Sequence, residues 1–368
     1  MSDIRITPLI RSLPNAVPFV GPETLERVRG APFDARLGAN ESIFGPSPRA
    51  IQAMRDAAVE IWKYPDSTSH DLRHALAAQN GIAPENIVVG EGIDGLLGYL
   101  VRLMIAPGDT VVTSDGAYPT FNYHVTGYGG VLHKVPYRDD HEDPAALMVR
   151  AAEVGARLVY LANPDNPMGT WHDGAALTAA LDALPDGAML VLDEAYVEFA
   201  PAAAPVHIDD PRVIRMRTFS KAYGMAGARV GYAMGPAALI AEFEKVRNHF
   251  GMNRMAQVGA LAALEDAGWL AHVLAEVAAA RDTIARIATE NGLRSIPSAT
   301  NFVSIDCGGD GALARAVVDG LAERGVFVRM PFAAPQNRCI RVSCGAPADL
   351  EIFQAALPGA LAGARGLP

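Results

Sequence analysis

Between about Pro46 and Gly235 the chain alternates short apolar runs with amphipathic helical patterns. In several of these runs apolar residues follow one another without a polar face, which is typical of strands covered by helices on both sides. Strand–helix alternation of this kind predicts an α/β fold with a mostly parallel sheet. The expected strands cover residues 87–89, 110–113, 131–135, 158–162, 189–192, 213–218 and 230–233.

Downstream of Gly235 the pattern changes to longer helical stretches mixed with a few strands. A chain of 368 residues is long enough for a large and a small domain. We predict a large α/β domain over residues 46–268, with residues 1–45 and 269–368 forming an N-terminal segment and a small α+β domain. The elements expected after Gly235 are helices at 237–248, 255–267, 269–291 and 348–360, and strands at 301–305, 326–328 and 339–342.

Composition argues against several classes of protein. A net charge of −10 and a pI near 5.4 do not favour nucleic-acid binding, which usually relies on a basic patch. No stretch approaches the roughly 18 apolar residues of a membrane span, and residues 1–18 lack the apolar run of a signal peptide. The three cysteines and nine histidines show neither metal-ligand spacing nor a disulfide framework. These features predict a cytoplasmic protein without a resident metal.

A lysine directly follows one of the expected buried strands, within residues 217–224 (RTFSKAYG). A loop lysine is usually a solvated surface charge, but ligands of open α/β sheets bind beyond the carboxyl ends of the strands. A lysine that is partly desolvated and near other cations has a lowered pKa and can form an imine with an aldehyde. Arg217 and Arg229 would supply the positive charge. Lys221 is therefore a candidate nucleophile.

Two more polar groups follow neighbouring strands. Asp193 ends the apolar run at 189–192, and it either caps the next helix or pairs with a pyridinium nitrogen and keeps that nitrogen protonated. Tyr196 would then donate a hydrogen bond to the phenolic oxygen of the ring. Residues 163–169 (NPDNPMG) form a turn, because a residue before proline is kept out of the helical region. Asn166 in this turn would point its amide at the same ring.

A glycine-rich loop opens the helix that follows the first expected strand. Residues 90–95 (GEGIDG) match Gly-x-Gly-x-x-Gly, and Asp115 follows at about the spacing of a dinucleotide-binding fingerprint. Free N–H groups at a helix N-terminus bind the phosphate of a dinucleotide or of a phosphorylated aromatic cofactor equally well. A dinucleotide-dependent oxidoreductase is therefore an alternative, although such an enzyme has no need of Lys221 or Asp193.

Three other side chains suit a phosphorylated aromatic cofactor and an anionic substrate. Tyr118 follows the second expected strand and would stack on a flat ring. Tyr64 lies in a loop from which its hydroxyl would reach a phosphate. Arg341 lies inside the apolar run 339–344, an unusual place for a charge unless it meets an anion such as a carboxylate.

Residues 163–169, the Asp-Glu-Ala-Tyr run at 193–196 and the run SKAYGMAGARVGY at 220–232 together resemble the fold-type I pyridoxal-phosphate enzymes of aminotransferase classes I and II. The resemblance covers nearly the whole chain and is strongest to the histidinol-phosphate aminotransferase branch. It implies a mostly parallel seven-stranded sheet between helices, a smaller α+β domain, pyridoxal 5′-phosphate as cofactor, and a homodimer with shared active sites.

The resemblance also implies roles for single residues. Lys221 corresponds to the Schiff-base lysine and proton carrier, and Asp193 to the acid at the pyridine nitrogen. The other implied cofactor contacts are Asn166 and Tyr196 at the phenolic oxygen, Tyr118 on the ring, Gly92, Ile93, Asp94, Thr218, Ser220 and Arg229 at the phosphate, and Tyr64 at the phosphate of the neighbouring subunit. Arg341 corresponds to the arginine that binds the substrate carboxylate, and Asn40 to the N-terminal segment that closes over the substrate. Phe19 and Arg329 are the other candidate substrate residues.

The implied reaction has two half-reactions in ping-pong order, in which an amino donor loses its amino group to the cofactor and a 2-oxo acid takes it up. A pyridoxal-phosphate decarboxylase or lyase of the same fold would share every cofactor residue and is the second hypothesis. Phe19 stands where the branch often has a tyrosine that helps to bind substrate phosphate, and Ile93 replaces a hydroxyl in the phosphate loop. The donor, an amino acid or amine, therefore stays open, with histidinol phosphate and an aromatic or apolar amino acid as candidates.

Overall fold

The computed structural model describes residues 4–15, 20–202 and 210–366, so the predicted substrate residue Phe19 lies outside the described residues. Its main sheet has the strand order β2-β8-β7-β6-β5-β3-β4. Strand β8 runs antiparallel to both its neighbours, and the other neighbouring pairs are parallel. The predicted seven-stranded, mostly parallel α/β sheet is thus confirmed. The strands are β2 (Ile87–Gly90), β3 (Thr110–Ser114), β4 (Val131–Val135), β5 (Leu158–Ala162), β6 (Met189–Asp193), β7 (Val213–Thr218) and β8 (Gly231–Met234).

Helices cover both faces of the main sheet, which explains why its strands carry consecutive apolar residues. Successive side chains of a strand point to opposite faces. Val111 packs with α5 (Gly92–Met104) and α6 (Thr120–Gly127), whereas its neighbour Val112 packs with α7 (Pro144–Val154) and α8 (Gly174–Leu181). Each face therefore has its own apolar core.

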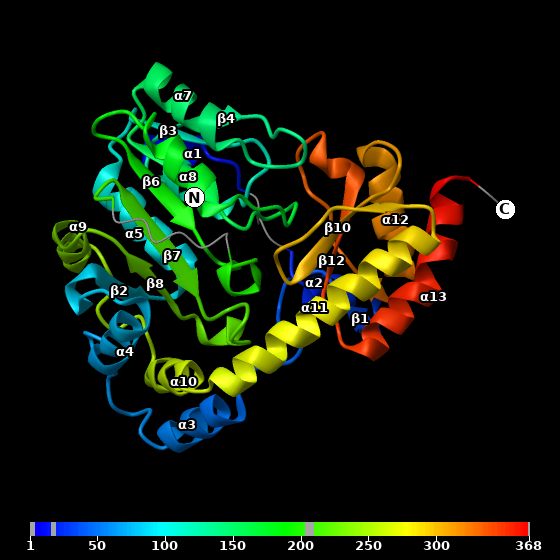
Figure 1. Cartoon of the computed structure of the whole chain (residues 1–368), viewed down its shortest axis with the longest axis horizontal. Coiled ribbons are helices and arrows are strands. Elements are labelled where there is room, and N and C mark those ends of the chain that lie inside the picture. The colour runs from blue at the N-terminus through cyan, green and yellow to red at the C-terminus, as the bar shows by residue number, and fades with distance from the viewer. Residues whose placement is uncertain (1–3, 16–19, 203–209, 367–368) are drawn as a thin grey trace.

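A third apolar core lies between β2, β8 and a group of helices made of α3 (Pro48–Ala58), α4 (His70–Asn80) and α10 (Arg254–Leu264), with α3 and α10 side by side (Figure 1). The helix predicted at 237–248 is shorter than expected. Helix α9 (Ala237–Glu242) gives way to a single 3₁₀ turn (Phe243–Lys245). After this turn the backbone is held by a long-range hydrogen bond instead of a helical one, since Asn248 N donates to Tyr99 Oη at 3.0 Å.

The 24-residue helix α11 (Ala267–Glu290) begins beside α10 and runs to a second group of elements (Figure 1). We call this group the small domain, and the main sheet with its helices the large domain. Strand β10 (Phe302–Asp306) lies between β9 (Arg294–Ser295) and β12 (Cys339–Ser343), antiparallel to both, and packs with α12 (Gly311–Glu323) and α13 (Pro347–Ala364). Strand β1 (Ala35–Arg36) pairs in parallel with β11 (Val326–Phe327), which joins the N-terminal segment to the small domain. The short helices α1 (Pro8–Ser12) and α2 (Pro22–Arg29) precede β1.

Within the described residues, no single helix combines the length and the apolar composition of a membrane span; α10 and α11 meet these criteria only when joined across an 82° bend.

The carboxyl ends of β2, β3, β5, β6 and β7 lie at one edge of the main sheet, since these strands run in the same direction. Each of these ends leads into a segment that carries a predicted site residue. These residues are Gly92 after β2, Tyr118 after β3, Asn166 after β5, Asp193 at the end of β6 and Ser220 after β7.

Candidate active site

A cavity of about 460 Å³ opens at this edge of the main sheet, between the large and the small domain. Most of the predicted site residues line it, and the fold brings together residues as far apart in sequence as Asn40 and Arg341. The predicted residues that line the cavity are Asn40, Ile93, Asp94, Tyr118, Asn166, Asp193, Tyr196, Thr218, Ser220, Lys221, Arg229, Arg329 and Arg341.

Lys221 is one of the residues that line the cavity. Its Nζ donates to the backbone oxygen of Asn40 at 3.1 Å and lies 5.4 Å from the ring centre of Tyr196. Burial lowers the pKa of Lys221 to about 8, and the positive charges of Arg341 and Arg229 act in the same direction. A lysine with this pKa has an appreciable neutral fraction near physiological pH, which is the form that attacks a carbonyl carbon.

Asp193 contributes a carboxylate to the lining of the same cavity. Its Oδ2 accepts a hydrogen bond from Tyr160 Oη at 2.7 Å, and its Oδ1 accepts one from Ala195 N at 2.9 Å. Burial raises the pKa of Asp193 to about 6, while these two hydrogen bonds oppose the rise. Tyr160, which lines the cavity and donates to Asp193, is a candidate site residue that the sequence reasoning missed; the available signal was a polar-tipped residue in the otherwise apolar strand β5.

A group of donors gathers at the N-terminus of α5. The N-cap residue Glu91 makes no side-chain cap, so the first backbone N–H groups of the helix keep their donors available to a ligand. Thr218 Oγ1 donates to Ser220 Oγ at 2.9 Å, and Arg229 Nη1 donates to the same Ser220 oxygen at 3.3 Å. Backbone N–H groups, hydroxyls and a guanidinium in one place form an anion pocket suited to a phosphate.

Gly92 allows Arg229 to reach this pocket. Gly92 has a φ of +80°, and a Cβ added there would lie 2.4 Å from Arg229 Nη2. We expect Gly92→Ala to raise the dissociation constant of pyridoxal phosphate by roughly 10²-fold, because the guanidinium is displaced and the backbone strained. Titration of the apoenzyme, followed by cofactor absorbance, measures this. Gly95→Ala, in the same helix with its nearest contacts at 3.4 Å, is the matched control and should bind normally. Equal affinities for the two variants would contradict the pocket.

Two arginines that line the cavity form no ion pair within 4 Å among the described residues, although the carboxyl group of Glu41 acts electrostatically on Arg329 and that of Asp165 on Arg341. Arg341 Nη1 donates to Asn166 Oδ1 at 2.5 Å and Nη2 to Gly38 O at 3.4 Å, while its buried Nε has no hydrogen-bond partner. Arg329 donates to Val20 O. Burial lowers the pKa of Arg341 to about 10, with Arg329 contributing. Both guanidinium groups are therefore held by neutral oxygens and are available to an anionic substrate.

Asn40 is fixed in place by the small domain. It has a left-handed φ of 54°, and its Nδ2 donates to Tyr196 Oη at 3.2 Å. Its Oδ1 accepts from Ser343 Oγ at 3.1 Å, and Asn301 Nδ2 donates to the Asn40 backbone oxygen at 3.2 Å. Ser343 and Asn301 are supporting residues that the sequence reasoning also missed, because nothing local in the sequence shows that they meet Asn40.

Two expectations about positive charge and cofactor class are corrected by the structure. Arg217 faces away from Lys221, and its Nε donates to Glu194 Oε2 at 2.8 Å, because it alternates with Thr218 along β7. The loop at 90–95 does not belong to a dinucleotide-binding βαβ unit, since β2 and β3 are far apart in the strand order. Asp115, the fingerprint acid, pairs with Lys134 at 3.1 Å.

Tyr64 lies apart from the cavity of its own chain. Its side chain is 79% exposed, and its ring packs against Phe250 at a centroid distance of 4.9 Å. The backbone oxygen of Tyr64 accepts a hydrogen bond from Arg254 at 2.8 Å. Any contact of this hydroxyl with a cofactor must therefore be made in a second copy of the chain.

The sequence profile of the family "Aminotransferase class I and II" matches residues 35–357. The chain belongs to this aminotransferase family. The histidinol-phosphate aminotransferase of Moorella thermoacetica is 35% identical over 359 residues, covering 96% of this chain and 92% of the relative. The enzyme of the same name from Anaeromyxobacter sp. is 35% identical over 358 residues, covering 96% and 98%.

Solved structures of aminotransferases share the fold. The histidinol-phosphate aminotransferase of Sinorhizobium meliloti, solved with pyridoxal 5′-phosphate, is 52% identical with a TM-score of 0.95, and the match covers 98% of each chain. The aspartate aminotransferase of Thermus thermophilus is 23% identical with a TM-score of 0.77, covering 91% of this chain and 94% of that one, and shows the fold alone. The predicted family, the fold type and the pyridoxal-phosphate-dependent aminotransferase activity are thereby confirmed.

The side chains of this aminotransferase suit pyridoxal phosphate. The cavity holds a buried amine with a lowered pKa, a buried carboxylate, and an uncapped helix N-terminus with hydroxyls and a guanidinium beside it. These are, in turn, partners for an aldehyde, a pyridine nitrogen and a phosphate.

Proposed function

We propose that this aminotransferase transfers the amino group of histidinol phosphate to a 2-oxo acid. The observation that carries the proposal is the pair of guanidinium groups, Arg329 and Arg341, that line the cavity with neutral partners only. A phosphate dianion neutralises two such groups, and a planar guanidinium binds its oxygens bidentately. Relatives that are 35% identical over nearly the whole chain carry the name histidinol-phosphate aminotransferase, which supports the same donor.

We further propose how the cofactor is held. Pyridoxal phosphate, when bound, supplies an aldehyde that joins to amines and a ring that withdraws electrons from the joined carbon. Lys221 would hold the aldehyde carbon through Nζ, Asp193 would keep the ring nitrogen protonated, and Tyr118 would stack on the ring. The phenolic oxygen would be met by Asn166 and Tyr196, and the phosphate by Gly92, Ile93, Asp94, Thr218, Ser220 and Arg229.

The chain's own residues would divide the remaining work between proton transfer and positioning. Nζ of Lys221 is neutral over part of the physiological pH range. It would take the proton from the α-carbon of the donor and deliver it to the aldehyde-derived carbon of the cofactor. Asn40, held by Ser343 and Asn301, closes the cavity from the N-terminal segment. Arg341 and Arg329 fix the anionic end, so that the α-carbon faces Lys221.

A panel of amino donors tests the substrate. The holoenzyme is mixed with histidinol phosphate, histidinol, phenylalanine, tyrosine or aspartate, and the loss of the cofactor's aldehyde absorbance gives kcat/KM for the donor half-reaction. We expect histidinol phosphate to exceed histidinol by roughly 10²- to 10³-fold, because histidinol leaves both arginines without an anion. Phenylalanine reacting as fast as histidinol phosphate would overturn the proposed donor in favour of an aromatic amino acid. A donor that yields no keto product would favour a decarboxylase or lyase.

We also propose that the enzyme is a cytoplasmic homodimer in which Tyr64 completes the phosphate site of the partner subunit. Apolar side chains cluster in sequence around Tyr64, and Val59, Ile61 and Trp62 are 76%, 54% and 76% exposed. Apolar surface of this kind is normally covered by a partner. The location of Tyr64 outside its own cavity supports the exchange.

Mixing two inactive variants tests the shared site. Lys221→Ala lacks the amine and Tyr64→Phe lacks the phosphate contact, yet a mixed dimer has one site with both native residues. Random 1:1 mixing should restore about a quarter of the wild-type activity, since half of the dimers are mixed and each has one intact site. The test requires that Tyr64→Phe alone is severely impaired. No gain in activity after subunit exchange would argue against a shared site.

A further inference from the structure

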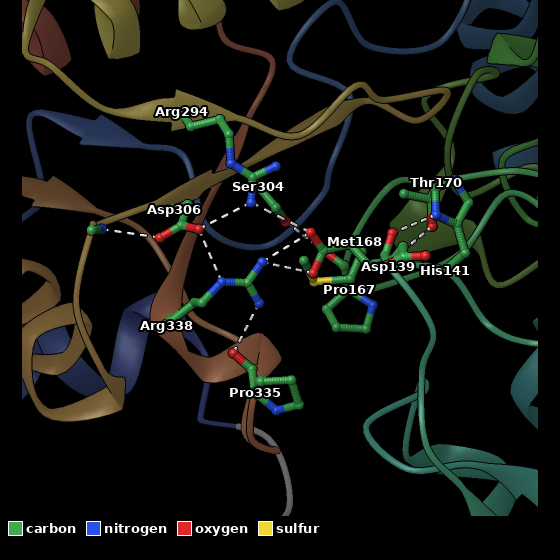
Figure 2. Close-up of polar contacts among 12 residues, drawn as sticks. Asp139, His141, Pro167, Met168, Thr170, Arg294, Ser304, Asp306, Pro335 and Arg338 are labelled. Carbon is green, nitrogen blue, oxygen red and sulfur yellow. Dashed lines mark hydrogen bonds and ion pairs between the residues drawn. The ribbon is translucent and has the colours of Figure 1, made fainter.

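Four charged side chains, none of them among the residues that line the cavity, form a network, and Figure 2 labels three of them, Arg294, Asp306 and Arg338. Arg338 Nη2 lies 2.8 Å and 2.9 Å from the two carboxylate oxygens of Asp140, and its Nε donates to Asp306 Oδ2 at 2.9 Å. Arg294 approaches the same two acids at 3.6 Å and 3.1 Å. The side chains of Arg338, Asp140 and Asp306 are only 21%, 14% and 16% exposed, so water screens this network less than a surface ion pair.

The Arg338–Asp140 pair joins the two domains. Asp140 lies in the large domain, in the turn between β4 and α7, where it has a left-handed φ of 66°. Arg338 is the last residue of a 3₁₀ turn (Gln336–Arg338) in the small domain and directly precedes β12. The pair thus attaches the beginning of β12 to the large domain, three residues before Arg341.

On both domains, the segments joined by this ion pair are connected by hydrogen bonds or strand pairing to residues of the substrate site. On the large-domain side, the backbone oxygen of Asp140 accepts a hydrogen bond from Thr170 Oγ1 at 3.0 Å, at the end of the turn that carries Asn166. On the small-domain side, Ser304 is paired in register with Arg341 across β10 and β12, and its Oγ donates to Pro167 O in the same turn at 2.7 Å. Figure 2 shows Arg338, Ser304, Pro167 and Thr170 gathered around this boundary.

Arg341 and Asn166 are in direct contact at the centre of this arrangement. Arg341 Nη1 donates to Asn166 Oδ1. This hydrogen bond fixes the guanidinium that would bind the substrate relative to the amide that would contact the cofactor. A displacement of about 1 Å in such a contact is enough to change rates strongly. The relative position depends on how β12 is fixed to the large domain, because Arg341 belongs to β12 and Asn166 to the large domain.

We propose that the Arg338–Asp140 ion pair is an interdomain clamp that places Arg341 against Asn166, and that Arg338 and Asp140 are positioning residues for the anionic group of the substrate. This inference rests on the proposed function, in which Arg341 binds that anionic group. Arg338 acts through Arg341 and touches neither cofactor nor substrate.

Steady-state kinetics of the holoenzyme test the clamp. The donor used is whichever member of the panel above has the highest kcat/KM. Arg338→Gln is expected to raise the KM of that donor by about 10-fold and to leave kcat within about 3-fold, with unchanged cofactor affinity. Arg338→Lys should recover part of the loss, because an ammonium keeps the charge but not the fork that reaches two acids. Asp140→Asn, which keeps a residue that tolerates the left-handed conformation, should match Arg338→Gln.

Arg294→Gln is the matched control. Arg294 contacts the same two acids but lies on β9, is 61% exposed and does not adjoin β12, so its loss should leave KM unchanged. A double-mutant cycle adds a second readout. Because Arg338 acts through Arg341, Arg338→Gln should cause no further rise in KM when Arg341 is already glutamine.

The outcomes separate the clamp from the proposed donor. A rise in KM for Arg294→Gln equal to that for Arg338→Gln, or full additivity in the cycle, would overturn the clamp. A lower melting temperature with unchanged KM would overturn it as well, because the pair would then be merely structural. If Arg338→Gln does not fold, Asp140→Asn decides by the same criteria. A panel in which histidinol phosphate is not the best donor sinks the proposed donor alone, since the clamp is measured with the donor that is.

Discussion

Replacement of Lys221 by alanine is expected to lower kcat by roughly 10⁴-fold, the largest effect of any single change in this enzyme. The amine is the group that would both hold the cofactor and move the proton, and the cavity offers no second amine in its described lining. Stopped-flow and steady-state assays with the best donor measure the loss. Borohydride reduction of the wild-type enzyme, followed by peptide mass spectrometry, should place the cofactor-derived mass on Lys221.

Two controls separate the neutral amine from the positive charge. Lys221→Arg keeps the charge but remains protonated at any usable pH, so it should be as inactive as the alanine variant. Lys134→Ala removes a lysine that pairs with Asp115 outside the cavity and should be fully active. Activity in Lys221→Arg close to wild type would show that charge alone suffices and would sink the assignment.

The pH dependence of cofactor uptake offers an independent check on Lys221. Burial lowers the pKa of this amine to about 8, so the neutral fraction rises as the pH passes upward through that value. The rate at which the apoenzyme captures pyridoxal phosphate should rise with pH over the same range. Arg341→Gln removes a positive charge that contributes to the lowering, so it should move the midpoint of this rise to higher pH.

Asp193→Asn is the change with the second largest expected effect, a fall in kcat of roughly 10²- to 10³-fold. A carboxylate under the ring nitrogen stabilises a positive charge there, and that charge is needed to withdraw electrons from the reacting carbon. The neutral amide has nearly the same shape, so cofactor affinity should fall much less than turnover. Equilibrium titration and kcat measured on the same preparations give the two numbers.

Tyr160→Phe is the companion variant for Asp193. It removes the hydrogen bond to Asp193 Oδ2 but leaves the carboxylate and the bond from Ala195 N. We expect a loss of roughly 10-fold, smaller than that of Asp193→Asn, since a hydrogen bond to a charged group contributes about 1.5–3 kcal/mol and the carboxylate keeps its bond from Ala195 N. Unchanged turnover in Asp193→Asn, or a Tyr160→Phe variant as poor as Asp193→Asn, would contradict the role given to the carboxylate.

The strands of the main sheet could be predicted from sequence because their apolar runs reflect burial on both faces, a local and readable property. Strands β4, β5 and β7 have the predicted bounds, and the others differ by a residue or two. The cofactor residues could also be named, because their motifs follow strand ends and resemble a known family. The family and the fold could therefore be predicted from the sequence alone.

The misses among the site residues depend on tertiary position, whereas helix α12 was missed although its N-cap, Asp310, and its amphipathic pattern are local. Nothing local reveals that Tyr160 meets Asp193, that Asn301 and Ser343 hold Asn40, or that Arg217 turns toward Glu194. The end of α9 likewise depends on a bond from Asn248 to Tyr99, about 150 positions earlier in the chain. The division at residues 46–268 stays a prediction, and so do the individual roles of the site residues, which the experiments above address.

The neutral hydrogen-bond acceptors of Arg341 and Arg329 have a consequence for the enzyme in a medium rich in small anions. The two guanidinium groups donate hydrogen bonds to uncharged carbonyl and amide oxygens. Their positive charges therefore attract small anions from solution. Inorganic phosphate and sulfate offer nearly the charge and oxygen geometry of the phosphate in the proposed donor. If Arg341 and Arg329 bind that phosphate, the apparent affinity for the donor will fall as the concentration of free phosphate or sulfate rises.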